Sequence, residues 1–330
     1  MRQPRFRLAR RRAPLAPLAL AALLTAPLAP TPATARTPVA GAASPTTVVP
    51  VQRKSSPTTL LSTRTYRLTA GDKVALDTDP LRFETGSWGA GRPTNVGTTL
   101  LLTCVGPDGR RALHAHDGEN LTPQEPRRKP DIRALLEASR SGTYRCELRA
   151  SAYTNAWARG MTVHLIGEPG FASALAGRTA FTWDRPAAAG DLALVPGRVA
   201  EPMNVTRPAA AGGERMTVTV DAEVTTCNNT RDYAVCAGRD PSASGAVFRS
   251  WLVVQGRDAA GRPVGRTHRS AVVTRTVTAA KHHHMLHHTL PAAVPSAARR
   301  LDVRLRTQVV SGDRMVFHAG YGYAHGVVLR

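Results

Sequence analysis

The sequence predicts an all-β protein built from two antiparallel β-sandwich domains, and three observations carry this prediction. Many short segments alternate apolar and polar residues with a period of two, which is typical of strands with one buried face. Turn-forming residues separate these segments, for example over 257–263 and 311–313. Long amphipathic helical patterns do not occur between them. Together these features favour sandwiches over folds that alternate strands with helices.

The first predicted domain covers residues 59–168. Every second residue is apolar over 100–104 and over 144–150, so each segment is expected to be a half-buried strand. The segments 65–68 and 73–76 predict a hairpin around Gly71. One short helix is expected over 131–138, because this run follows Pro130.

The second predicted domain covers residues 214–330. Its clearest strands are 216–224 and 301–309, where valine, leucine and alanine alternate with polar or charged residues. Further strands are expected at 247–255, 271–278, 282–290 and within 315–329. Residues 169–213 are richer in proline, glycine and alanine and are interpreted as a connector, with a possible strand over 179–183. Residues 36–58 read as a disordered leader.

Residues 1–35 have the three parts of a cleavable secretory signal. Six arginines and no acid fall in the first twelve positions, an apolar run covers 13–29, and small residues end the segment at Ala33-Thr34-Ala35. The apolar run contains proline and is shorter than the ~20 residues that span a bilayer. Cleavage after Ala35 or Ala42 fits, as does export by the general or the twin-arginine route. We therefore expect a secreted, extracellular protein without a transmembrane segment.

The chain is strongly basic, with 44 Lys+Arg against 23 Asp+Glu and a formal net charge of +21. Six of these charges would leave with the signal, so the excess on the mature chain is about +15. Most basic residues are arginines scattered singly, which together with abundant alanine, glycine and proline indicates a GC-rich bacterial genome. The one cluster, at 126–130, has no interleaved aromatic residues for base stacking. This pattern argues against nucleic acid and favours an anionic cell-wall polymer or a carbohydrate as partner.

Four cysteines in an exported chain predict two disulfides. Cys104 and Cys146 lie on the inward faces of predicted strands, so a bond between them would cross the core or join two neighbouring strands. Cys227 and Cys236 are nine positions apart and would close a loop at the end of a strand.

The run Ser141-Gly142-Thr143-Tyr144-Arg145-Cys146 resembles the strand that leads to the second cysteine of immunoglobulin-like domains. In that family a tyrosine two places before the cysteine makes a corner hydrogen bond to the backbone. The resemblance is confined to 141–146. It implies an immunoglobulin-like or jelly-roll-like sandwich in which Tyr144 has the corner position.

The densest group of metal-ligating residue types lies at 282–288. The candidate ligands there are His282, His283, His284, Met285, His287 and His288. Imidazole suits zinc and copper, and a thioether adds a preference for Cu(I), so copper or zinc is the only cofactor the sequence suggests. Histidines solvated at a strand end, without metal, are the alternative. His268, His318 and His325 lie in other segments and could converge with the group.

No catalytic motif is present: the chain lacks a Gly-x-Ser-x-Gly elbow, a His-Glu-x-x-His helix and a phosphate-binding loop. Glu201, Glu214 and Glu223 have no distinguishing context. The aromatic residues Trp251, Tyr321 and Tyr323 are candidate ligand-binding residues that could stack on a sugar, with Trp157 in support. A terminal strand with core aromatics explains the two tyrosines equally well.

These observations predict a secreted, non-enzymatic binding or structural protein, associated with the cell surface or with carbohydrate. The first alternative is extracellular copper or zinc binding through 282–288. The second is a hydrolase whose site the known motifs do not reveal.

Overall fold

The computed structural model describes residues 45–53, 58–86, 88, 93–154, 161–177, 179–209, 213–227, 234–237, 245–320 and 322–329. The predicted signal at 1–35 and much of the leader lie outside these residues. Strands dominate the described chain, and its helices are two short 3-10 turns, η1 (Ala187–Ala189) and η2 (Ala234–Cys236). Neither of these has the length or the apolar character that a membrane crossing needs. The predicted all-β class is confirmed.

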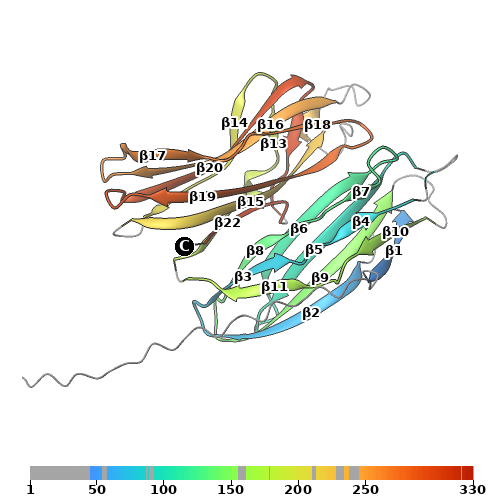
Figure 1. The fold of residues 1–330 in the computed structure, drawn as a ribbon, viewed down its shortest axis with the longest axis horizontal. Coiled ribbons are helices and arrows are strands. Elements are labelled where there is room, and N and C mark those ends of the chain that lie inside the picture. Colours follow the sequence, from blue (N-terminus) through green and yellow to red (C-terminus); the bar gives the residue numbers. More distant parts are fainter. Residues whose placement is uncertain are drawn as a thin grey trace, which may run out of the picture. The chain divides into compact units, whose positions relative to one another are not determined.

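The described strands form four sheets (Figure 1). The first contains, in spatial order, β6 (Arg111–Leu121), β5 (Val96–Val105), β9 (Gly142–Thr154), β1 (Thr46–Arg53), β10 (Thr162–Ile166), β4 (Arg82–Glu84) and β7 (Arg127–Arg128), with β2 (Thr59–Leu68) also paired to β9. The second contains β11 (Phe171–Leu175), β3 (Lys73–Thr78) and β8 (Arg133–Glu137).

The other two sheets come from the second half of the chain. One contains β12 (Phe181–Asp184), β22 (Ala324–Leu329), β15 (Glu214–Thr226), β21 (Met315–Phe317) and β13 (Leu192–Leu194), with β19 (His283–Val294) paired to β15. The other contains β14 (Val199–Pro208), β20 (Arg300–Gly312), β16 (Ala246–Arg257) and β17 (Pro263–Arg269), with β18 (Val273–Val277) paired to β16.

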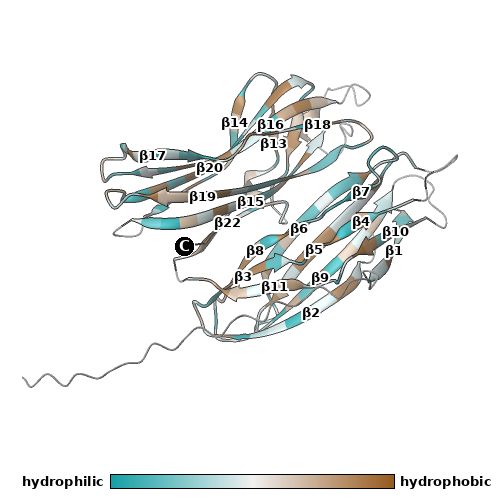
Figure 2. Ribbon diagram, viewed as in Figure 1, coloured by the Kyte–Doolittle hydropathy of each residue, from teal (hydrophilic) through white to brown (hydrophobic). Residues whose placement is uncertain are grey.

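Two hydrophobic cores follow from the period-two pattern of these strands. Apolar and polar residues alternate along β5 and β9 (Figure 2). The buried apolar side chains of both strands belong to the first core. The second core lies between the β15 and β16 sheets and takes its side chains from alternate positions of both. Burying one face of each strand fixes its register, since a one-residue slip would expose the whole apolar set. Both cores belong to one compact unit, residues 43–330.

The strand β8 corrects the helix expected over 131–138. Residues 133–137 are extended and pair with β3. Ala134 and Leu136 enter the first core, whereas Leu135 packs on the opposite side with Ala180 and Val327. Because both faces of β8 are covered, its apolar residues are consecutive, and a short apolar run cannot be told from a buried helix by its period.

Three further segments differ from the sequence interpretation. Residues 65–68 and 73–76 are strands but form no hairpin with each other, because β2 pairs with β9 and β3 pairs with β11 and β8. The leader contains β1, whose Val49 is buried and which pairs antiparallel with β10 and parallel with β9. The predicted connector is also structured: Phe171 of β11 belongs to the first core. Its strands β12, β13 and β14 belong to the two sheets that enclose the second core.

Two disulfides are present, in agreement with the cysteine content. Cys104 and Cys146 lie directly opposite each other on β5 and β9, with Cα atoms 4.0 Å apart, so this bond joins neighbouring strands instead of crossing the core. The Tyr144 hydroxyl donates a hydrogen bond of 2.9 Å to the carbonyl oxygen of Arg140. The corner bond implied by the immunoglobulin-like run is therefore formed, although the disulfide next to it lies within one sheet.

Candidate metal centre

Two buried acids lie on β15, at the middle of the six-stranded sheet. This strand pairs with β19 on one side and with β22 and β21 on the other. Its apolar residues face the second core, so Asp221 and Glu223 point to the opposite side. In the register, His287 of β19 and His325 of β22 lie opposite Asp221. Histidines from both flanking strands therefore meet the acids of the central strand.

Glu223 is surrounded by imidazole rings. Its Oε2 lies 2.8 Å from Nε2 of His116, which comes from β6. Its Oε1 is hydrogen-bonded to Nδ1 of His283 and lies 3.9 Å from Nε2 of His318. Burial alone would raise the pKa of Glu223, but His283 and His116 outweigh it and hold this pKa well below its ordinary value. Glu223 is therefore a buried carboxylate anion that faces ring nitrogens.

Glu223, His283 and His318 form a potential metal-binding set. Each offers one ligand atom, and these atoms lie within 4.8 Å of one another. One carboxylate and two imidazoles are a known donor set for zinc with three protein ligands. At zinc–ligand distances of ~2.0–2.1 Å, tetrahedral ligands are about 3.4 Å apart. To admit an ion, the 3.9 Å between Oε1 of Glu223 and Nε2 of His318 would have to shorten, and the direct hydrogen bond between Glu223 and Nδ1 of His283 would have to open.

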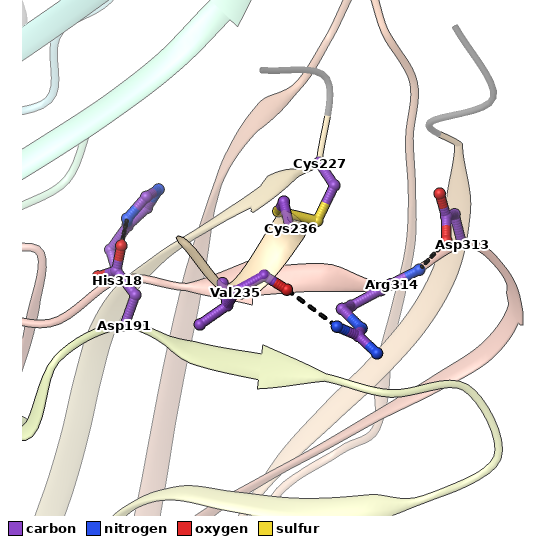
Figure 3. The surroundings of a disulfide bond; sticks show 7 residues. All are labelled: Asp191, Cys227, Val235, Cys236, Asp313, Arg314 and His318. Carbon is purple, nitrogen blue, oxygen red and sulfur yellow. Dashed lines mark hydrogen bonds and ion pairs between the residues drawn. A yellow bond between two sulfur atoms is a disulfide. The ribbon is translucent and has the colours of Figure 1, made fainter. Parts of the chain in front are cut away.

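Asp191 orients one of these rings (Figure 3). Its Oδ2 lies 3.5 Å from Nδ1 of His318, while Nε2 of the same ring faces Glu223. A metal-binding histidine usually donates its second ring N–H to a carboxylate or carbonyl, which fixes the tautomer and the ring plane. The Cys227–Cys236 disulfide packs against Val316 of β21, the strand that ends at Phe317, directly before His318.

Glu223 differs from the other buried acids near it in the kind of cation it meets. Asp117 is paired with Arg128, Asp221 with Arg133 and Glu119 with Lys281. Within the described residues, every ion pair of Glu223 is with a histidine. Among the described residues Glu223 therefore has no permanent cation, and its compensating charge there comes from a proton or a metal ion held by the imidazoles.

The seven-residue histidine segment is divided among separate partners. His283 is the one member of it in the three-residue set with Glu223 and His318. The other four histidines contact different groups: His282 the Ala279 carbonyl, His284 Glu119, His287 Asp221, and His288 Ser250. Met285 is buried at 3% exposure. Of the three distant histidines that could converge with the segment, His318 meets His283, His325 lies 3.6 Å from Asp221, and His268 contacts the Ala293 carbonyl.

Sequence reasoning missed the acids of this site. Glu223 has no distinguishing context in the sequence, and Asp191 falls in the segment interpreted as a connector. One usable signal is present: Asp221 and Glu223 occupy the polar face of a predicted strand, and the histidine segment is a second strand. Pairing these two strands would bring acids and histidines together, but a period-two pattern does not identify the pairing partner.

The three candidate aromatic residues lie in different surroundings. Trp251 is 6% exposed, and the guanidinium of Arg269 lies 4.5 Å from the centre of its ring. Tyr323 packs edge-on to His116, with ring centres 4.5 Å apart, so it belongs to the surroundings of Glu223. Tyr321 lies outside the described residues. Trp251 therefore presents no open ring face for stacking on a sugar.

The charge on His287 should make stability depend on pH. Burial lowers the pKa of His287, but the hydrogen bond to Asp221 and the charges of Asp117 and Asp131 outweigh it and raise this pKa to about 9. Arg133 also pairs with Asp221 and keeps its positive charge over this whole pH range. A raised folded-state pKa stabilises the fold fully below the unfolded value of about 6.5, and the contribution disappears as pH rises through 9.

We therefore expect the free energy of unfolding to fall by roughly 2–3 kcal/mol between pH 6.5 and pH 9.5. Urea unfolding of the wild type and of His287→Gln across this range measures the effect. The variant lacks the titrating group and should show a flatter profile. Parallel profiles for the two proteins would show that His287 does not carry the dependence.

Comparisons with known proteins give no family. No protein-family model matches the chain, and no curated protein matches its sequence. Among solved structures, a candidate secreted protein of Parabacteroides distasonis aligns at 10% identity over 87% of this chain and 90% of that one, with a TM-score of 0.17. The N-terminal CBM22 tandem domain of Paenibacillus barcinonensis Xyn10C aligns at 9% identity over 80% of each chain, with a TM-score of 0.21. The VP2 subviral particle of infectious bursal disease virus gives 9% identity, 85% and 79% coverage and a TM-score of 0.22. Superpositions this loose support no argument about function.

Proposed function

We propose that this is an exported, non-enzymatic binding protein that holds one metal ion through Glu223, His283 and His318. Zinc is the metal that we expect first. The observation that carries the proposal is the buried carboxylate of Glu223, which meets imidazoles and no arginine or lysine within the described chain. A divalent cation would take the place of the protons on the imidazoles that otherwise compensate this carboxylate, and neutral imidazole is a preferred zinc ligand.

The surroundings of the three ligands support this proposal. Asp191 orients His318 from behind, and His116 holds the second oxygen of Glu223. Gly118 makes room for that contact, because a Cβ at this position would lie 2.3 Å from Nε2 of His116. The two disulfides fit a protein that works in an oxidising compartment, as the export signal expected at 1–35 requires.

Calorimetric titration of the purified, chelator-treated protein with ZnCl₂ tests the proposal. The wild type should bind one Zn²⁺ per chain. Glu223→Gln keeps the shape of the side chain but removes the charge, and should weaken binding by more than a hundredfold. Asp191→Asn removes only the orienting carboxylate and should weaken binding by roughly 10–100-fold. A parallel titration with CuCl₂ compares the two metals.

His164→Ala is the matched control, because this histidine lies on β10 and belongs to the first half of the chain. It should leave zinc binding unchanged. If Glu223→Gln does not fold, as judged by circular dichroism, the zinc affinities of the wild type and of Asp191→Asn still test the metal centre. Equal, weak isotherms for wild type, Asp191→Asn and His164→Ala would reject the metal centre.

A further inference from the structure

A second feature, independent of the metal centre, is the outward face of the five-stranded sheet. The inward side chains of β16 and β20 fill the second core, so the alternate side chains point outward. Six arginines lie on this outward side, and we call them the arginine face: Arg249, Arg257, Arg269, Arg300, Arg304 and Arg306. The register places them on three neighbouring strands, β17, β16 and β20.

Acidic residues neutralise only part of the arginine face. Glu201 pairs with Arg304 and Arg306 at 3.5 and 2.7 Å. Asp302 pairs with Arg257 and also with Arg304, at 2.9 Å to the latter. These two acids against six arginines leave an excess of about four positive charges on one rigid sheet surface.

Three members of the face are exposed and have no acidic partner among the residues that the structure describes. Within the described part of the chain, no carboxylate pairs with Arg249, Arg269 or Arg300. Arg249 instead bonds the Gln308 amide oxygen at 2.9 Å, and Arg269 lies over the Trp251 ring. These contacts hold the two guanidinium groups in place but leave their charge uncompensated. Ordering a cation before its ligand arrives lowers the entropy lost on binding.

The residue type of the six cations also limits which chemical groups the face would bind. All six cations are arginines, whose planar fork donates two parallel hydrogen bonds to a phosphate or carboxylate, whereas lysine acts as a point charge. Neighbouring strands lie ~4.8 Å apart and alternate residues along a strand ~6.8 Å apart. A flexible polymer with closely spaced anionic groups can therefore contact several members of the face at once.

From this charge complementarity we propose that the arginine face binds a linear phosphate-bearing polymer. Such a polymer gains by displacing counterions along its length, so affinity falls as salt concentration rises. The buried position of Trp251 beneath Arg269 agrees with recognition by charge instead of by ring stacking on a sugar.

The probe for this proposal is long-chain inorganic polyphosphate, titrated into the purified protein at several NaCl concentrations. The test variant is Arg249→Glu with Arg269→Glu and Arg300→Glu. Its affinity should fall at least tenfold, and its slope of log affinity against log salt should become shallower by about three, one for each phosphate that the face no longer neutralises. Because Arg269 lies 4.5 Å from the Trp251 ring, polyphosphate should also change tryptophan emission in the wild type and not in the variant.

The matched control reverses three exposed arginines of the first half of the chain: Arg67→Glu, Arg110→Glu and Arg111→Glu. It changes the net charge by the same amount and should alter the affinity less than about twofold. Equal reductions in affinity for both triple variants would show attraction by overall charge alone and would overturn the proposal. Wild-type protein that does not bind polyphosphate, or that binds polygalacturonate more tightly, would overturn it as well.

Discussion

Replacing Arg128 with methionine should lower the free energy of unfolding by about 3–5 kcal/mol. Arg128 is 7% exposed, and its guanidinium pairs with Asp117, which is completely buried. It also donates hydrogen bonds to Thr98, at 2.6 Å to the hydroxyl and 3.1 Å to the carbonyl oxygen, and it lies over the Phe83 ring. Methionine can occupy similar space but removes the permanent cation of the buried Asp117 carboxylate, whose remaining ion pair among the described residues is with His287, at 3.4 Å.

Arg127→Met is the control, because Arg127 is the next residue in the chain and forms an ion pair at the surface. Its side chain is 64% exposed and lies 2.9 Å from Glu84. Removing such a pair should cost less than about 1 kcal/mol. Urea unfolding of both variants measures the difference. Similar decreases in the two variants would contradict the role assigned to the buried pair.

Removing the Cys104–Cys146 disulfide should have an effect of similar size. The bond closes a segment of 42 positions, and the chain-entropy model gives a decrease of about 4 kcal/mol when the unfolded chain is freed. Both cysteines are fully buried and lie opposite each other in the β5–β9 pair. Replacing both with alanine adds the cost of poorer packing to the entropy term.

The Cys227–Cys236 bond provides the comparison, since it closes only nine positions. The same chain-entropy model gives about 2.5 kcal/mol for its removal by a double alanine variant. Urea unfolding under non-reducing conditions ranks the two variants. If Cys104→Ala with Cys146→Ala destabilises the protein no more than the other double variant does, this ordering is contradicted.

The sequence predicted best those strands that have one buried face. β15 and β20 alternate because their inward residues fill the second core, and both lie close to the positions expected from the sequence. The helix expected at β8 is wrong because this strand is covered on both sides and does not alternate. The expected hairpin of β2 and β3 failed for a different reason: a turn such as the one at Gly71 can also lead the chain from one sheet to another.

The candidate centre could be predicted only in part, because its residues come from distant segments. The histidine segment is visible as a local motif, but the contacts of His283 with Glu223 and of His284 with Glu119 span 60 and 165 positions. The Tyr144 corner could be predicted because its bond spans four positions. The charges also depend on tertiary structure: among the described residues, Arg128 pairs with Asp117 and Arg133 with Asp221, whereas Glu223 pairs with histidines.

The most direct test of the metal centre is a crystal structure of the protein grown with Zn²⁺, with diffraction recorded on both sides of the zinc absorption edge. We expect one strong anomalous peak bounded by Glu223, His283 and His318, with ring nitrogens at ~2.0–2.1 Å from it. The Asp191 carboxylate should remain hydrogen-bonded to the far nitrogen of His318. A strong peak elsewhere in the histidine segment, or no peak between these three side chains, would contradict the account.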